Sequence, residues 1–137
     1  MTPISRRQFG IAAGAMALPA LHGCAAIWPQ NKVLSVGALF AGQVNDKGFM
    51  ESGWRGLEKA RTELGVKTQY IDSVAPKKEL LMQSLTVLAN SGVDLVIAHG
   101  GQNNEAAKLV AAEFPDVNFA VTQGNVIGAN LASYEVL

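Results

Sequence analysis

Three short segments of the sequence gather side chains that could bind a small molecule. They span residues 41–48, 99–104 and 123–125, and they are rich in glycine and in amide side chains. Asn and Gln side chains both donate and accept hydrogen bonds, which suits a neutral polar solute. The candidate contacts in these segments are Asn45, Asp46, Gly101, Gln102, Asn103 and Gln123.

Two aromatic residues, Phe40 and Phe49, bracket the first of these segments. Two rings beside amide-rich loops can enclose a flat ring between them, although an aromatic residue at the start of a helix more often belongs to the core. Asn45 and Asp46 also allow two interpretations. Their side chains can accept hydrogen bonds from a solute or from the free N–H groups at the start of a helix.

The groups that catalysis or metal binding needs are scarce. After residue 23 the sequence has a single histidine, His99, and it shows neither a Ser-His-Asp set nor a metal-binding cluster. For His99 a hydrogen-bonded structural role is favoured over a role as a ligand group. The run from Gly42 to Gly48 matches neither a dinucleotide-binding loop nor a Walker loop. The sequence therefore indicates a binding protein without cofactor or metal rather than an enzyme.

The first residues predict export and lipid anchoring. Arg6 and Arg7 precede an apolar stretch of about a dozen residues, whereas a membrane-spanning helix needs roughly 20. Basic residues, an apolar stretch and a small residue before a cleavage site are typical of a signal peptide, and Ser-Arg-Arg-x-Phe resembles the twin-arginine export signature. Leu21-His22-Gly23-Cys24 resembles a lipobox, so we expect cleavage before Cys24 and a diacylglycerol on its thiol.

These features divide the chain into three parts. We expect a twin-arginine and lipoprotein signal peptide over residues 1–23, a lipid-anchored tether over residues 24–32, and a binding lobe over residues 33–137. Removing residues 1–23 takes away two of the 11 basic residues and none of the 11 acidic ones, so the net charge of the mature chain is about −2. A basic patch is missing from the sequence, which argues against a nucleic-acid partner.

Hydrophobic patterning predicts alternating strands and helices. Apolar runs predict strands over residues 33–40, 66–71, 93–98 and 117–122, and a further short strand near residues 129–134. Helical spacing of apolar residues predicts helices over residues 49–64, from Pro76 to about Ser91, and over residues 103–114. The predicted apolar face of the first helix consists of Phe49, Gly53, Leu57, Ala60 and Leu64.

This order of elements predicts an α/β fold. A parallel, Rossmann- or flavodoxin-like sheet would carry helices on both faces. In such sheets, ligands bind at the carboxyl ends of the strands, where the strand order switches direction. The segments 41–48, 99–104 and 123–125 follow the first, third and fourth predicted strands, so the fold would bring them to one edge of the sheet.

Six motifs distributed over residues 33–137 make a family resemblance. They are Val36-Gly-Ala-Leu-Phe40, Val44-Asn-Asp-Lys-Gly-Phe49, Gly53-Trp-Arg-Gly-Leu-Glu-Lys-Ala60, Gly92-Val-Asp-Leu-Val-Ile97, Phe114-Pro-Asp-Val-Asn-Phe-Ala120 and Asn130-Leu-Ala-Ser-Tyr134. In these motifs the chain resembles the basic membrane protein (BMP) family of ABC-transporter substrate-binding lipoproteins, whose studied members bind purine nucleosides.

The resemblance implies a type I periplasmic-binding-protein fold, in which two α/β lobes close on a solute. By position, Phe49 matches the aromatic residue that stacks on the base, and Asn45 and Asp46 match the polar turn before it. Many members have an acidic ligand-binding residue where this chain has Phe40. This departure favours a second stacking ring at Phe40 and a purine-like solute.

The resemblance also implies a location and partners. It indicates an exported, lipid-anchored receptor that delivers a purine nucleoside or related purine to the permease and ATPase subunits of a bacterial ABC importer. Family members continue past the position of Leu137 into a second lobe, so we expect this chain to be truncated or a fragment and to bind solute weakly by itself. Two alternatives stay open, a sensing lobe of a signalling system and a flavodoxin-like enzyme.

Overall fold

The computed structural model describes residues 32–135. The predicted signal peptide with Arg6 and Arg7, the predicted lipid-attachment residue Cys24 and all of the tether except Lys32 lie outside the described residues. Within residues 32–135, no helix has the length and apolar character that crossing a bilayer requires.

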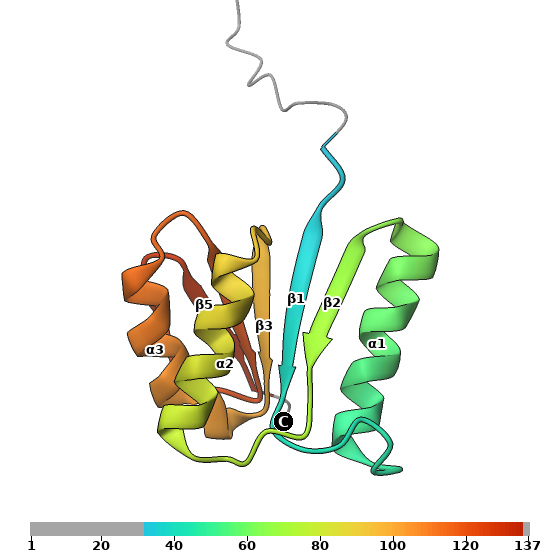
Figure 1. The fold of residues 1–137 in the computed structure, drawn as a ribbon, viewed down its shortest axis with the longest axis horizontal. Coiled ribbons are helices and arrows are strands. Elements are labelled where there is room, and N and C mark those ends of the chain that lie inside the picture. The colour runs from blue at the N-terminus through green and yellow to red at the C-terminus, as the bar shows by residue number, and fades with distance from the viewer. Residues whose placement is uncertain (1–31, 136–137) are drawn as a thin grey trace, which may run out of the picture. The chain divides into compact units, whose positions relative to one another are not determined.

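Strands and helices alternate in the predicted order (Figure 1). The elements are β1 (Ser35–Phe40), α1 (Phe49–Leu64), β2 (Lys67–Ile71), α2 (Lys78–Asn90), β3 (Leu95–His99), the 3₁₀ turn η1 (Gly101–Asn103), α3 (Asn104–Glu113), β4 (Asn118–Thr122) and β5 (Leu131–Tyr134). The bounds of α1 match the prediction, because Gly65 ends the helix in the left-handed conformation, at φ 68°. α2 begins at Lys78 instead of at Pro76, since the preceding Lys77 is extended.

The strands form one parallel sheet in the order β2-β1-β3-β4-β5. From β1 the chain moves outward to the edge strand β2, and it then returns past β1 to β3. The strand order therefore switches direction between β1 and β3. The predicted parallel α/β fold is confirmed, and the loops after β1 and β3 flank the position at which such sheets bind ligands.

Helices cover the two faces of the sheet unequally (Figure 1). α2 and α3 pack side by side on one face, where the larger core cluster contains Leu39, Val96 and Val121 from the strands. On the other face α1 lies over β1 and β2. Its Leu57 is buried against Val36, Ala38 and Phe40.

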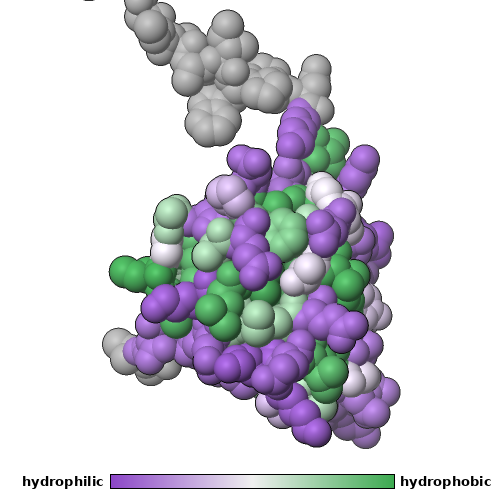
Figure 2. Space-filling view, turned by 60° about the vertical axis from the view of Figure 1, so that its left-hand side comes forward, coloured by the Kyte–Doolittle hydropathy of each residue, from purple (hydrophilic) through white to green (hydrophobic). Residues whose placement is uncertain are grey.

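The described residues leave the β3–β5 part of the α1 face without a covering helix. Ile97, Ala120 and Ala132 are in register with one another on this face, and Tyr134 follows on β5 with its side chain on the same face. These four residues are half-buried or exposed. Hydrophobic surface is also visible between hydrophilic residues on the side of the molecule that bears α3 and β5 (Figure 2). We refer to the uncovered β3–β5 part of the sheet as the open face.

The predicted apolar face of α1 is only partly correct. Leu57 is buried, but Leu64 in the last turn is 75% exposed. α1 lies beside the edge strand β2, so fewer elements surround the ends of this helix than surround α2 (Figure 1). The helical spacing identified the helix, but its position at the edge of the sheet decided which residues it buries.

Candidate functional site

The carboxyl ends of four strands bring one row of side chains together on the α1 side of the sheet. The register pairs Phe40 with His99, His99 with Thr122, and Thr122 with Tyr134. Residues paired in this way in a parallel sheet point to the same face. The row crosses the switch between β1 and β3, and His99 lies at its centre.

Both ring nitrogens of His99 have hydrogen-bond partners. Nε2 lies 3.0 Å from the carbonyl oxygen of Phe49, and because a carbonyl only accepts, Nε2 holds the proton. Nδ1 then accepts a hydrogen bond from the Thr122 hydroxyl at 2.8 Å. The Thr122 oxygen in turn accepts the backbone N–H of Gly100 at 3.0 Å. The predicted hydrogen-bonded structural role of His99 is confirmed.

The surroundings of His99 favour the neutral ring. Burial lowers the pKa of His99 below its usual value, since a site of low polarity disfavours the charged imidazolium. The Phe49 carbonyl and the Asp46 carboxylate act in the opposite direction and raise the pKa by less. The net result is a neutral histidine at pH 7 with a defined tautomer.

The ring of Phe49 stacks on His99. The two ring centroids lie 4.0 Å apart at an interplanar angle of 19°. Phe49 is 37% exposed, so part of this residue is accessible to solvent beside His99. Gly53, one turn further along α1, makes the close approach possible, because a Cβ there would lie 2.6 Å from Cε1 and Nε2 of His99.

Phe40, the predicted second stacking ring, is only 2% exposed. Its ring meets Tyr70 edge-on at a centroid distance of 6.0 Å and His99 at 5.5 Å. The structure therefore places Phe40 in the core beside His99. It does not place Phe40 opposite Phe49, so the two rings do not form the walls of one slot as predicted.

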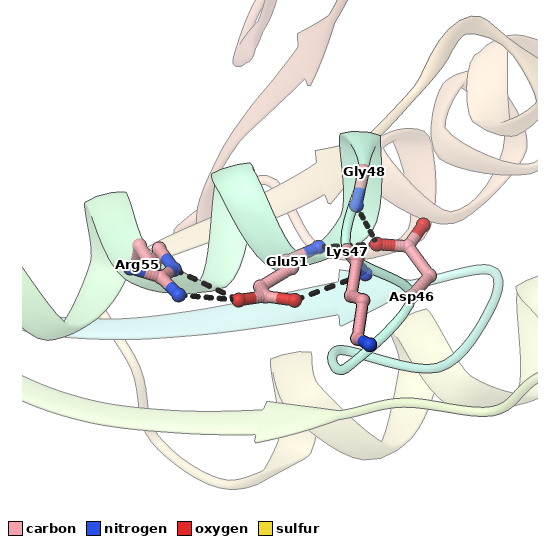
Figure 3. Close-up of polar contacts among 5 residues, drawn as sticks. All are labelled: Asp46, Lys47, Gly48, Glu51 and Arg55. Atoms are coloured by element: carbon pink, nitrogen blue, oxygen red, sulfur yellow. Dashed lines mark hydrogen bonds and ion pairs between the residues drawn. The ribbon is translucent and has the colours of Figure 1, made fainter.

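Asp46 caps the N-terminus of α1. Its carboxylate accepts backbone N–H groups from Gly48 at 2.8 Å and from Glu51 at 3.0 Å (Figure 3), and a third from Met50 at 3.1 Å. These hydrogen bonds, that of Glu51 above all, lower the pKa of Asp46. The capping interpretation is confirmed for Asp46. Its negative charge also occupies the position at which a helix N-terminus would attract an anion.

Asn45, in contrast, is exposed and lines an open cleft of about 740 Å³ beside the start of α1. Glu51 crosses the floor of this cleft, where it accepts the backbone N–H of Lys47 at 2.9 Å and binds the Arg55 guanidinium at 2.5 Å (Figure 3). Lys47 itself has a left-handed backbone, at φ 55°. Two of the charged side chains that line the cleft, Glu51 and Arg55, are thus paired with each other.

The amides after β3 have different environments. Asn103 is fully buried, and its Nδ2 donates to the carbonyl oxygens of His99 and Gly100, both at 3.0 Å. Its Oδ1 has no partner among the described residues. Gln102 is exposed and donates to the His99 carbonyl at 3.4 Å. Asn103 thus fixes the turn after β3, while Gln102 stays accessible to a solute.

The loops after β3 and β4 are joined. A Cβ at Gly101 would lie 2.5 Å from the carbonyl oxygen of Gln123, so this close approach requires glycine. Nδ2 of Asn104 donates to Oδ1 of Asn125 at 2.8 Å. Gln123 is exposed and has a left-handed backbone, at φ 52°. The predicted residues Gly101 and Gln123 therefore meet through their backbones.

A second cavity, a groove of about 360 Å³, runs from the strand ends onto the open face. Its lining includes Phe40, Ser52, Gly53, Gly56, Ile97, His99, Thr122 and Tyr134. The predicted site residues divide among separate features. Asn45 lines the cleft beside α1, Phe40 lines the groove, and Gln102 and Gln123 lie on the loops.

Sequence reasoning missed Thr122 and Gly53. Thr122 ends the fourth predicted strand, so its polar side chain at a strand end was an available signal. Gly53 was counted as part of an apolar face, although a glycine inside a helix costs about 1 kcal/mol and therefore indicates a close contact. Among the described residues, no three His, Cys, Asp or Glu side chains gather as a metal site.

Comparison with known proteins identifies substrate-binding proteins and a transcriptional activator as relatives. A family model described as an ABC transporter substrate-binding protein, PnrA-like, matches residues 33–135. The transcriptional activator protein Med of Bacillus subtilis is 26% identical over 113 residues, which cover 82% of this chain and 35% of Med.

Solved structures share the fold. An ABC transporter solute-binding protein from Conexibacter woesei aligns with a TM-score of 0.67 and 25% identity, over 74% of this chain and 34% of that protein. An ABC transporter solute-binding protein from Aeropyrum pernix aligns with a TM-score of 0.65 and 27% identity, over 74% of this chain and 28% of that protein. The chain thus spans about a third of the length of these relatives.

Proposed function

Because the chain belongs to the family of PnrA-like ABC transporter substrate-binding proteins, we propose that it forms most of one lobe of a solute receptor. The receptor captures a small polar solute at the strand ends and delivers it to an ABC permease and its ATPase. The parallel sheet, with its switch between β1 and β3, supports this proposal, as does the similarity to solute-binding proteins.

The proposed solute is a purine nucleoside or a related purine. The single observation that supports it most is the partly exposed Phe49, which stacks on His99 at the carboxyl edge of the sheet and so can offer the other face of its ring to a solute. A flat aromatic base stacks favourably on such a face. The exposed amides of Asn45, Gln102 and Gln123 supply donors and acceptors for the polar edge of a base or for ribose hydroxyls.

Ligand-observed NMR on the full chain tests this proposal with inosine, guanosine and adenine as probes. We expect saturation transfer to the purine protons in the wild type and a strong loss in Phe49→Ala. Leu109→Ala is the matched control, since Leu109 is an exposed apolar residue on α3, away from the strand-end loops. Equal transfer in Phe49→Ala and in the wild type contradicts the proposed contact.

Affinity should be low for this chain alone. The chain spans about a third of the length of its relatives. Contacts from one lobe alone leave the other side of a solute in water. We therefore expect dissociation constants weaker than micromolar, which corresponds to less than about 8 kcal/mol of binding free energy. Micromolar binding of inosine in a calorimetric titration would refute this expectation.

Export and lipid anchoring are part of the same proposal. Lipid attachment at Cys24 would hold the receptor at the periplasmic face of a bacterial membrane or at the cell surface, beside its permease. Metabolic labelling with a lipid precursor should mark the wild type and not Cys24→Ala. Replacing Arg6 and Arg7 by Lys should retain the precursor inside the cell, whereas equal export of both forms argues against the twin-arginine route.

A second candidate is a sensing role, in which the lobe reports a solute to a regulatory partner. The similarity to the transcriptional activator protein Med favours it, at 26% identity. Genes for a permease and an ATPase beside the gene for this chain would favour transport. Regulatory genes in that position, with no transporter genes, would favour sensing.

A further inference from the structure

His99 connects three loops of the candidate site. Its backbone ends β3, its Nε2 reaches the first residue of α1, and its Nδ1 reaches the last residue of β4. We propose that His99 is the positioning residue of this site: as the neutral Nε2–H tautomer it holds Phe49 so that the free face of the phenyl ring meets the solute. The role of Phe49 in solute binding rests on the proposed function. The hydrogen bonds and the stacking by which His99 holds Phe49, called the clamp below, do not rest on it.

The hydrogen bonds around His99 run in one direction only. The N–H of Gly100 donates to the Thr122 oxygen, the Thr122 hydroxyl donates to Nδ1 of His99, and Nε2–H donates to the Phe49 carbonyl. Every polar group in this series of hydrogen bonds has a partner of the correct type, and the N–H of Gly100 also reaches the Thr122 carbonyl oxygen at 3.2 Å. The other neutral tautomer would place an N–H against the Thr122 oxygen and leave the Phe49 carbonyl without this donor.

Packing gives the ring a single position. Phe49 covers one face of His99, and the Phe40 ring meets it at an angle of 61°. The backbone of Gly53 lies so close to the ring edge that even a methyl group there would overlap it. Because hydrogen bonds and packing both restrain His99, the stacked Phe49 ring is restrained with it.

Protonation would loosen this clamp. A proton on Nδ1 turns the acceptor of the Thr122 hydroxyl into a donor. The Thr122 oxygen would then accept both Nδ1–H and the N–H of Gly100, and its own hydroxyl hydrogen would lose the acceptor that Nδ1 provides. Asp46, which precedes α1, is the charged group that acts on the ring. Its negative charge favours the protonated form of His99. The other ionisable groups in the surroundings are the phenols of Tyr134, next in the row on β5, and Tyr70 of β2, which contacts Phe40.

The first experiment reads the tautomer directly and needs no solute. Long-range ¹H–¹⁵N spectra of the full chain as His22→Gln, in which His99 is the only histidine, should show the Nε2–H tautomer at pH 8. Thr122→Val removes the hydroxyl and should give a mixture of tautomers. Thr122→Ser keeps the hydroxyl and should restore the single form. A wild-type ring with the Nδ1–H tautomer, or a mixture, overturns the proposal.

The second experiment links the clamp to the solute, with inosine as the probe. Thr122→Val should weaken inosine binding by about tenfold, the effect of losing roughly one buried hydrogen bond, and Thr122→Ser should restore it. Affinity of the wild type should be unchanged near pH 7 and should fall at more acidic pH, as the pH approaches the pKa of His99, which burial lowers below its usual value of about 6.5. Equal affinities of wild type and Thr122→Val overturn the positioning role. If the first experiment shows a single Nε2–H tautomer but the wild type does not bind inosine, the proposed solute is overturned and the clamp is retained.

Discussion

At the scale of single residues, Gly53 shows how a missing side chain shapes the site. It allows α1 to approach the ring of His99, where a Cβ would overlap the ring edge at 2.6 Å. Real Cβ atoms do not tolerate such a distance, so any side chain would have to separate α1 from β3. A shift of α1 would also move Phe49, which begins the helix.

Gly53→Ala should therefore destabilise the fold, although alanine is the better helix former. Overpacking of this kind costs about 1–3 kcal/mol. Gly56→Ala is the matched control one turn further on, because a Cβ there meets nothing within 4 Å. The control should gain up to about 1 kcal/mol of helix propensity. Urea unfolding measures both, and a stabilising effect of Gly53→Ala would contradict the close contact.

The sequence predicted the residue types of the site better than their roles. Gln102 and Gln123 follow the expected strand ends, Phe49 begins α1 as expected, and all three residues are exposed. Phe40 and Asn103 are buried, because the first is the last residue of a strand whose side chain faces α1, and the second folds back on the turn after β3. A side chain's direction depends on neighbouring elements, which the local pattern does not contain.

At the scale of elements, the start of α1 depends on Asp46. Its carboxylate satisfies three of the backbone N–H groups that a helix leaves without partners. Asp46→Ala should therefore lower the melting temperature by about 4–8 °C, the shift that losing a typical N-cap causes in a domain of this size. Asn45→Ala is the control, since Asn45 is exposed and directly precedes the cap. Thermal unfolding compares the two, and equal melting temperatures would argue against the cap.

Asn130 joins the end of α3 to the start of β5. Its Nδ2 lies 2.9 Å from the carbonyl oxygen of Ala111, 2.8 Å from that of Phe114 and 2.7 Å from that of Val117. These carbonyls end the helix and lead into β4. Two of them also accept backbone N–H groups, Ala111 from Phe114 at 3.3 Å and Phe114 from Val117 at 3.1 Å, so Asn130 adds a side-chain donor to this turn. The Asn-Leu-Ala-Ser-Tyr motif thus includes a residue with a structural role at its first position.

Asn130→Asp should be more destabilising than Asn130→Ala. The introduced carboxylate would face three carbonyl oxygens, whereas alanine only removes the donor, a change that costs about 1–3 kcal/mol. The difference between the two variants should shrink at low pH, where the introduced carboxyl group is protonated and can donate again. Chemical unfolding at pH 7 and pH 4 tests this. A variant Asn130→Asp as stable as the wild type would contradict the role of Nδ2.

At the scale of the whole molecule, His99 makes stability depend on pH. The folded state lowers the pKa of His99, so between that value and the unfolded value near 6.5 the unfolded chain binds more protons. The contribution of His99 to the free energy of unfolding is therefore complete above about pH 6.5, and it is lost as the pH falls through the lowered pKa of the folded state. Urea unfolding from pH 8 to pH 5 should show this decrease, and His99→Gln should remove it.

The fold itself was predictable because its signals are regular. Continuous apolar runs identified the buried strands, and β2, with its more alternating pattern, lies at the edge of the sheet. The position of α1 over β1 and β2 could not be derived from spacing within the helix. It depends on which strands the helix connects and on the small residues Gly53 and Gly56 that face the groove.

The open face has a calorimetric consequence. Apolar surface that stays hydrated in the folded state does not change its hydration on unfolding, so it adds nothing to the heat-capacity increment. A residue such as Ile97 that is only half-buried contributes less to this increment than a core residue on the α2 and α3 side. Scanning calorimetry should therefore give an increment below the usual ~12–15 cal/mol/K per residue.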